Sequence, residues 1–284
     1  MEISVICSRE RERKRSDMKI GRAEDFFRNL NGIQLRVLDG GYAAGGLEWN
    51  GSVNAPPYSR LYYICGGDPY IEAEGDPVRL EQGWCCLLPA GFSFRFACRT
   101  AMEQLYFHIQ LVDDTGIDLL RSCREMLAMP AGEERIRRMR SLTDENSPRA
   151  SLGLRQELYG TLLSLLDAGG VELSRTVCSP CVLDAVGYIR EHLSLQLTVG
   201  ELAAHAHVSE STLEKTFRAE MGQSIGRYID QEIFLKAESR LRHTDLSIAQ
   251  MSAEFGFCDQ FYFSRRFRER YGLSPRQYRR ERPI

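Results

Sequence analysis

The spacing of apolar residues changes along the chain and divides it into two halves of different character. From residue 20 to residue 112, short apolar or alternating runs are separated by Gly, Pro, Asp and Asn, which predicts frequent strands and turns. The expected strands, in chain order, are 34–38, 60–65, 70–73, 84–88, 93–97 and 104–111. Such a series of strands favours a small β-barrel or jelly roll.

Between residues 116 and 167 the apolar residues recur at three- and four-residue steps, which predicts amphipathic helices. These residues are Ile117, Leu120, Leu127, Leu154, Leu158, Leu162, Leu165 and Leu166. The run Asp144-Glu-Asn-Ser-Pro148 between them is a turn signal. The leucine-rich helix packs either on the barrel or against a second copy of itself, and the sequence favours neither. Residues 169–180 are expected to form an interdomain linker.

Residues 247–278 predict two helices joined by a tight turn. Ser247 can cap the first helix, and Gly256 can take the left-handed backbone that a sharp turn requires. Asp259 can cap the second helix, which Gly272 ends. This order is typical of a helix-turn-helix, whose second helix can enter a DNA major groove. The alternative is an ordinary helical hairpin with a solvated charged face.

The same order occurs roughly fifty residues earlier in the chain. The segment Thr198-Val-Gly-Glu201 has the spacing of a capping box, His207 occupies the turn, and Ser209 can cap the next helix. A long helix is expected between the two copies, after Ser224. Roughly eighteen residues at about 1.5 Å each give a rod of about 27 Å. That length approaches the ~34 Å between successive major grooves on one face of B-DNA.

Composition narrows the class of protein. The chain has 284 residues, of which 43% are hydrophobic and 27% charged, as expected for a soluble protein with two domains. No apolar run approaches the ~20 residues that span a bilayer, and the N-terminus lacks the order of a signal peptide. A cytoplasmic protein without a membrane partner is therefore expected. Residues 1–19 carry mixed charge without an apolar face, which predicts a disordered tail.

Charge is distributed unevenly. The net charge of −2 argues against a broadly basic surface that coats nucleic acid. Positive charge nevertheless concentrates beside the second helix-turn-helix, where the last twenty residues contain only two acidic residues, Glu269 and Glu281. The arginines of this segment are Arg265, Arg266, Arg268, Arg270, Arg276, Arg279, Arg280 and Arg282.

The residue types that bind metals are sparse. Nine cysteines show no framework spacing, which predicts reduced thiols, and the pair Cys178 and Cys181 lacks the second pair of a structural zinc site. The segment from Gly83 through Pro89-Ala-Gly91 to Phe94 resembles the second cupin motif. Metal-binding cupins place a histidine where Phe94 stands, and an earlier strand supplies a His-x-His pair that is missing here. We therefore expect no metal, no cofactor and no catalytic residues.

A small barrel can instead hold one small ligand in its mouth. The side chains considered for this role are Trp49, Arg60, Tyr62, Trp84, Phe94, Phe96, Tyr106 and His108. The alternative for each aromatic residue is that it fills the barrel, because aromatic side chains dominate cores. The alternative for His108 is a partly buried hydrogen-bonding residue.

Residues 181–280 resemble the DNA-binding domain of the AraC family of transcription regulators. The residues that carry the resemblance are Leu202-Ala203, Val208-Ser209, Leu213, Phe217, Gly222, Tyr228, Ala237, Leu241, Ile248, Gly256-Phe257, Asp259, Tyr262-Phe263-Ser264-Arg265, Phe267, Gly272, Ser274-Pro275 and Tyr278-Arg279. The upstream part resembles, more loosely, the sensor and dimerisation half of that family. The implied fold class is α+β: a cupin-like barrel at 20–112, a helical dimerisation or packing segment at 113–168, and an all-α DNA-binding domain at 181–284.

The resemblance implies a role for each outward position of the two recognition helices. Those expected to contact bases are Ser211, Glu214, Lys215, Gln260, Phe261, Tyr262 and Arg265. Those expected to contact phosphates are Arg218, Arg266, Arg268, Arg276 and Arg279. The chain departs from the family at Ile233, where an arginine is usual, and at His207, which replaces the turn glycine. Glu214 either weakens DNA binding by the first recognition helix, because its carboxylate repels phosphate, or accepts a hydrogen bond from a cytosine amino group.

These features together predict a sequence-specific transcription regulator of double-stranded DNA. A small-molecule effector, often a sugar or related metabolite in similar proteins, is expected in the barrel, and the chain is expected to form a homodimer. RNA polymerase is a further expected partner if the protein activates transcription. Two alternatives remain: a cupin-type enzyme with a DNA-binding appendage, and a ligand-free regulator whose barrel binds a partner protein.

Overall fold

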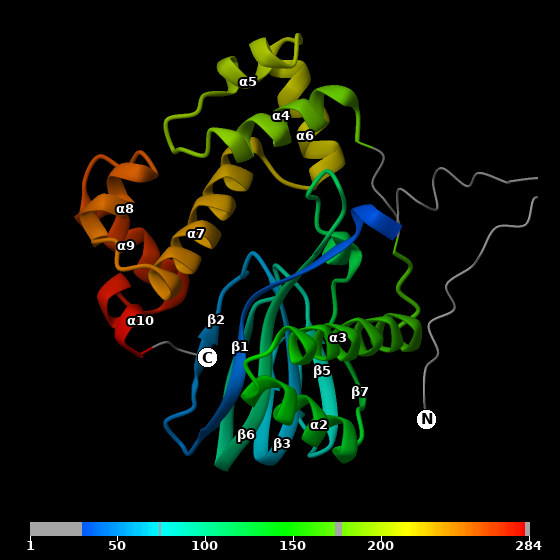
Figure 1. The fold of residues 1–284 in the computed structure, drawn as a ribbon. Coiled ribbons are helices and arrows are strands. Elements are labelled where there is room, and N and C mark those ends of the chain that lie inside the picture. Colours follow the sequence, from blue (N-terminus) through cyan, green and yellow to red (C-terminus); the bar gives the residue numbers. More distant parts are fainter. Residues whose placement is uncertain (1–29, 74, 174–177, 282–284) are drawn as a thin grey trace, which may run out of the picture.

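The computed structural model describes residues 30–73, 75–173 and 178–281 (Figure 1). Within these residues, an antiparallel sheet with two α-helices on it forms the N-terminal part, and seven α-helices form the C-terminal part. The predicted α+β class, with a β N-terminal half and an all-α C-terminal half, is confirmed. The expected disordered tail, residues 1–19, lies outside the described residues.

In the described part of the chain, seven strands make up the N-terminal sheet. They are β1 (Gln34–Gly45), β2 (Gly51–Val53), β3 (Ser59–Glu72), β4 (Val78–Arg79), β5 (Trp84–Leu88), β6 (Phe94–Val112) and β7 (Leu127–Pro130). The hydrogen-bonded order is β1-β6-β3-β5-β7, with β2 paired to β6 and β4 paired to β3. Among the described strands, the end members β1 and β7 do not pair with each other, so the ladder is open.

Two of the strands are longer than the sequence pattern predicts. The expected strands 60–65 and 70–73 are one strand, β3, and the expected strands 93–97 and 104–111 are one strand, β6. The pairing of β3 with β6 shifts register twice, between Ile64 and Gly66 and between Gly67 and Pro69. Gly67 has φ 85°, and a Cβ there would lie 2.2 Å from the Ala101 carbonyl oxygen. These bulges bend the strands without interrupting their pairing. In the sequence, the glycines at the bulges look like turn residues, which is why β3 is predicted as two strands.

Both faces of the sheet are buried. Alternate residues of β3 point to opposite sides, so that Leu61 and Tyr63 belong to one apolar cluster while Tyr62 and Ile64 belong to another. The first cluster is covered by α2 (Glu133–Asp144) and α3 (Pro148–Ala168). The helix α3 contributes Leu158, Leu162, Leu165 and Leu166. The leucine-rich helix thus packs on the sheet, as the first of its two predicted alternatives states.

The prediction of a helix around Ile117 to Leu127 is wrong. This segment contains only a short 3₁₀ helix, η1 (Leu119–Ser122), followed by the strand β7. Leu127 pairs with Leu87 of β5, and Met129 pairs with Cys85. The backbone groups along the outer edge of β5 need partners, and β7 supplies them. A four-residue strand is too short to show an alternating pattern that would distinguish it from a helical turn.

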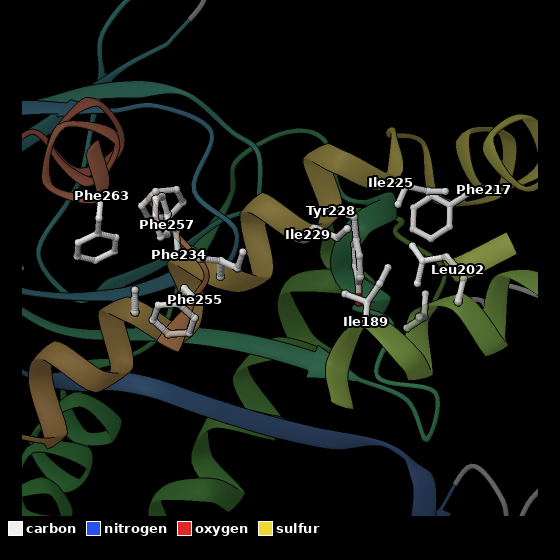
Figure 2. Packing of buried hydrophobic residues seen from close by; sticks show 14 of the residues in the cluster. Ile189, Leu202, Phe217, Ile225, Tyr228, Ile229, Phe234, Phe255, Phe257 and Phe263 are labelled. Carbon is white, nitrogen blue, oxygen red and sulfur yellow. The ribbon is translucent and has the colours of Figure 1, made fainter. Parts of the chain in front are cut away.

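The C-terminal half consists of α4 (Pro180–Glu191), α5 (Val199–His205), α6 (Glu210–Met221), α7 (Ile225–His243), α8 (Ile248–Glu254), α9 (Gln260–Tyr271) and α10 (Pro275–Glu281). The long helix α7 runs between the α4–α6 group and the α8–α10 group (Figure 1). Its buried residues join the apolar side chains of both groups in one cluster. Figure 2 shows Ile225 and Tyr228 near Phe217 at the start of α7, and Phe234, at the middle of α7, near Phe257 and Phe263. No helix in the described part of the chain is long and apolar enough to cross a membrane.

Candidate nucleic-acid interface

The first helix-turn-helix comprises α5, a turn and α6. Thr198 and Glu201 form the predicted capping box at the start of α5. His207 takes the left-handed backbone, with φ 54°, in the turn. Ser209 caps α6 by accepting a hydrogen bond from the backbone N–H of Thr212, and Gly222 ends α6 in a left-handed conformation. Each of these positions was predicted from the sequence.

The second helix-turn-helix, α8 to α9, repeats this geometry. Ser247 and Gln250 form a capping box, and Gly256 has φ 76° in the turn. Asp259 caps α9 by accepting hydrogen bonds of 2.7 Å from the backbone N–H groups of Phe261 and Tyr262. The backbone bonds of the two turns also correspond. They are Val208 N–H to the Ala203 carbonyl at 3.0 Å and Phe257 N–H to the Ser252 carbonyl at 2.9 Å.

The helix α7 holds the two motifs apart. Its 19 residues span about 28 Å at about 1.5 Å per residue. Phe234 at its middle stacks on Phe263 of α9 with ring centroids 6.2 Å apart. Tyr228 in its first half lies edge-on to Phe217 of α6 with centroids 5.6 Å apart. Each recognition helix is therefore fixed to α7 by aromatic packing. Ile233, where the family usually has an arginine, is fully buried in this core and makes no outward contact.

The predicted base-contacting residues lie mainly on the outward faces of the recognition helices. On α9, Phe263 and Phe267 are buried, whereas Phe261 is 77% exposed and Arg265 is exposed. Gln260 is half-buried at the start of the helix. Tyr262 is also half-buried, because its ring packs against Phe257 with centroids 5.8 Å apart. On α6 the predicted contacts Ser211, Glu214, Lys215 and Arg218 are all exposed.

The predicted phosphate contacts divide into two groups. Arg268 and Arg276 are exposed, as is Arg218 on α6. Arg266 instead donates to the carboxylate of Asp230 on α7, and its Nη1 lies 3.2 Å from the Tyr262 hydroxyl. Arg279 donates to the backbone carbonyl of Leu246. Arg266 and Arg279 thus link parts of the helical domain, a role that the sequence could not indicate because their partners, Asp230 on α7 and Leu246 between α7 and α8, lie more than thirty residues away in the chain.

This division gives a testable difference between two neighbouring arginines. We expect Arg268→Ala to weaken binding to all DNA sequences and to reduce the slope of log Kd against log salt by about 1, because one phosphate contact is lost. We expect Arg266→Ala to leave that slope unchanged, since its guanidinium is paired with Asp230. Fluorescence anisotropy titrations at several salt concentrations measure both slopes. An equal loss of slope in the two variants would contradict the division.

The residues predicted to line a ligand site gather on the inner face of the sheet. Trp49, Tyr62, Phe94 and Tyr106 are buried in one cluster, with Phe96 packed against it. Arg60 and His108 are buried polar side chains. Trp84 lies at the edge of a cavity of about 110 Å³ that Ile64, Leu80 and Cys86 also line. Within the described residues, no three His, Cys, Asp or Glu side chains converge as a metal site would require.

A buried polar network joins this face of the sheet to the helical domain. Arg242 of α7 lies 2.8 Å from the carboxylate of Asp39 on β1 and 3.2 Å from that of Glu238. Glu238, which is 3% exposed, also accepts hydrogen bonds from the hydroxyls of Tyr278 and Tyr58. Burial and the charge of Glu238 raise the pKa of Tyr278, so its hydroxyl remains protonated and can donate. Sequence reasoning missed this network, because charged residues on α7 resemble an ordinary solvated face.

Comparison with known proteins agrees with this geometry. A family model described as a helix-turn-helix domain matches residues 202–281. The xylose operon regulatory protein of Escherichia coli (strain K12) is 35% identical over 105 residues, which cover 37% of this chain and 27% of that protein. The transcriptional activator RhaS of Klebsiella pneumoniae (strain 342) is 28% identical over 128 residues, 45% of this chain and 46% of that protein. The chain thus spans less than half the length of these curated relatives.

A solved structure matches most of the chain. ToxT from Vibrio cholerae aligns with a TM-score of 0.61 over 88% of this chain and 98% of its own, at 11% identity. At that identity the match establishes a shared fold, in which an antiparallel sheet precedes a helical domain. Three findings agree. The helical part matches regulators in sequence, its helix-turn-helix geometry occurs twice, and the fold is shared with ToxT. Residues 202–281 of this chain are a helix-turn-helix domain of the AraC type.

Proposed function

We propose that the protein is a sequence-specific DNA-binding transcription regulator controlled by a small molecule. The observation that carries the proposal is the repetition of one helix-turn-helix geometry at both ends of α7, with the polar faces of α6 and α9 exposed. A xylose operon regulatory protein and the transcriptional activator RhaS match the same domain in sequence. A protein that acts on chromosomal DNA would work in the cytoplasm.

Selection of bound fragments from a random DNA pool tests the proposal. We expect enrichment of a single site with two sequence blocks, each contacted by one recognition helix. Enrichment of no sequence over the starting pool would refute sequence-specific binding. Repeating the selection with candidate metabolites present identifies whether an effector changes the result.

Among the residues expected to contact the selected DNA site, Arg265 has the most specific predicted role. Its guanidinium is exposed on α9 and can grip a guanine with two hydrogen bonds. We expect Arg265→Ala to relax the preference at one base pair at a cost of ~1–3 kcal/mol. The preference is measured as the Kd for a set of operators in which each position carries each of the four base pairs in turn. Uniform weakening on every sequence would assign Arg265 to phosphate instead.

The effector part of the proposal is supported by the contact between the halves. The candidate ligand residue Arg60 donates to the hydroxyls of Tyr62 and Tyr58, and the Tyr58 hydroxyl in turn donates to Glu238 on α7. A ligand that changed the inner face of the sheet would therefore alter a contact with the helix that carries both recognition motifs. Such a ligand controls DNA binding only if it binds one arrangement of the halves better than the other.

We also propose that the chain forms a homodimer through α3. Leu152 is 70% exposed and Leu163 is 55% exposed. Eleven residues at about 100° each place them on nearly the same side of the helix, away from the leucines that face the sheet. We expect sedimentation velocity to show a dimer that Leu163→Glu converts to a monomer. Leu47→Glu, at a residue 65% exposed between β1 and β2, is the control and should remain dimeric. A monomeric wild-type chain would refute this arrangement.

Two alternatives are tested separately. An enzyme with a DNA-binding appendage requires a metal or an acid–base pair in the sheet, so stoichiometric metal in the purified protein would favour it. A ligand-free regulator whose sheet binds a partner protein predicts that no small molecule changes DNA binding. RNA polymerase is the partner that we propose if the protein activates transcription.

A further inference from the structure

The inner face of the sheet carries a set of polar side chains arranged by strand register. Arg60 of β3 stands directly opposite His108 of β6 in the antiparallel pairing. Tyr62 and Tyr106 form the next pair on the same face, and Ile64 and Gln104 form the pair after that. His108 also pairs with Asp39 of β1 on its other side. The strands therefore line up a guanidinium, an imidazole and an amide along one buried surface.

Several polar atoms of this set have no hydrogen-bond partner within the described residues. They are both ring nitrogens of His108, the amide oxygen and nitrogen of Gln104, and Nε of Arg60. His108 is 1% exposed and Gln104 is 0% exposed. Buried polar groups are nearly always hydrogen-bonded, because an unpaired group loses its bonds to water without replacement. Arg60 and His108 form one cross-strand pair, and Gln104 lies two pairs further along the same face. Three side chains of one sheet face in this condition indicate a binding site for a molecule with matching polar groups.

Arg60 indicates the charge of that molecule. Its Nη1 lies 3.1 Å from the Tyr62 hydroxyl and its Nη2 lies 3.5 Å from the Tyr58 hydroxyl. None of the ion pairs found between described residues includes its guanidinium, which reaches the carboxylate of Glu238 only through the Tyr58 hydroxyl. A guanidinium that is only 7% exposed is normally paired with an anion. A carboxylate matches it best, since the two planar groups can form a pair of parallel hydrogen bonds.

His108 and Gln104 indicate hydroxyl groups. Burial, with Arg60 and Arg242 nearby, lowers the pKa of His108 well below its usual value. Its Nδ1 lies 3.8 Å from the Asp39 carboxylate, but a neutral imidazole forms no ion pair there. A neutral imidazole has one donor and one acceptor, as a side-chain amide has both kinds of group. A hydroxyl also donates and accepts, so it satisfies either side chain.

The surrounding walls are aromatic. Trp49, Phe94 and Phe96 lie in the same buried cluster as Tyr62 and Tyr106. The ring of Tyr58 stacks on His108 with centroids 4.7 Å apart and an interplanar angle of 26°. Apolar ring faces beside a few fixed polar groups are typical of sites for small ligands. They suit the C–H faces of a sugar ring better than a highly charged compound.

We propose that this face binds a small hydroxylated carboxylate, such as a sugar acid, with its carboxylate on Arg60 and its hydroxyls on His108 and Gln104. The inference rests on the proposed control by a small molecule and names the chemical class of that molecule. Tyr58 connects the site to the helical domain, since it bonds both Arg60 and Glu238. A carboxylate on Arg60 competes for these bonds and thereby loosens the contact with α7.

Isothermal titration of the full-length protein with matched sugars tests the proposal. The probes are D-glucuronate, D-galacturonate and D-gluconate, their neutral counterparts D-glucose and D-galactose, and the fatty acid oleate. We expect at least one sugar acid to bind with a Kd at least tenfold below that of its neutral counterpart. Arg60→Gln should raise that Kd at least tenfold, whereas the control Arg95→Gln, whose side chain is 78% exposed on the same sheet, should not.

Gln104→Leu gives a second result that does not depend on the folding of the Arg60 variant. Leucine removes two unpaired polar atoms from the core, so we expect the melting temperature to stay the same or rise. We expect the affinity for the sugar acid to fall at least tenfold in the same variant. An unchanged affinity would show that Gln104 does not contact the sugar acid, and would overturn the proposed arrangement of the site.

Other outcomes also overturn the inference. They are equal or tighter binding of the neutral sugar, tighter binding of oleate, or no heat from any sugar acid up to about 10 mM. Binding of a neutral sugar would leave control by a small molecule intact and refute only the carboxylate. Failure of the DNA selection would refute the proposed function, whatever the sugar acids do.

Discussion

Replacement of Arg242 by alanine is expected to destabilise the folded chain by about 3–5 kcal/mol. The guanidinium lies 2.8 Å from Asp39 and 3.2 Å from Glu238, and its removal leaves two carboxylates in a buried interface without their cation. Asp39 belongs to the sheet and Glu238 to α7, so the loss falls on the contact between the two halves. Urea unfolding followed by the fluorescence of Trp49 and Trp84, both in the sheet region, measures the change.

Arg240 provides the matched control on the same helix. It pairs with Glu254 at 3.3 Å, but the two side chains are 40% and 34% exposed. Exposed ion pairs contribute little, so Arg240→Ala should cost less than about 1 kcal/mol. Equal effects of the two substitutions would show that the buried network does not hold the sheet and the helical domain together. Glu238→Gln keeps an oxygen that accepts hydrogen bonds from the tyrosine hydroxyls, so its loss of stability should fall between those of Arg242→Ala and Arg240→Ala.

The second large effect is expected at Phe263, two residues from Phe261 on α9. Phe263 is fully buried between Phe234, Phe257 and Phe267, so Phe263→Ala should cost about 3–5 kcal/mol of stability. Phe261 is 77% exposed, and Phe261→Ala should change stability by less than about 0.5 kcal/mol. Thermal unfolding of the full chain distinguishes the two.

For Phe261 we expect a large effect on DNA binding, although its effect on stability should be small. An outward aromatic edge on a recognition helix can contact a thymine methyl group. We expect Phe261→Ala to raise the Kd for the selected operator about tenfold while the protein remains folded, which corresponds to roughly 1.4 kcal/mol. Unchanged operator affinity in this variant would remove Phe261 from the interface, and a large loss of stability would place its ring in the core.

The helical half of the fold was largely predictable from the sequence, and the reason is local. Ser247, Asp259 and Gly256 each determine a helix end through contacts within a few residues, so their positions in the chain are sufficient. The fixed spacing of the two copies then added independent support. The outward-facing positions of α9 were also predictable, because a helix with Phe263 and Phe267 buried must turn Phe261 and Arg265 outward.

The sheet and the interdomain contact were harder to predict, because they depend on partners far along the chain. Gly67 resembles a turn residue, yet it lies within a bulge of a continuous strand that pairs with β6. Leu127 resembles part of a helix, but the free edge of β5 makes it a strand. Arg266 resembles a phosphate contact until Asp230 of α7 is seen beside it. No local pattern reveals that Glu238 and Arg242 face the sheet.

Hydroxyl-radical footprinting of the selected operator tests most directly whether two equivalent recognition helices, held apart by α7, contact one DNA molecule. We predict two protected segments on the same face of the duplex, with centres about one helical turn, or 10–10.5 base pairs, apart for each protein chain. Lys215→Ala should weaken one segment, and Arg265→Ala should weaken the other. A single protected segment for each chain, or two segments on opposite faces of the duplex, would contradict the account.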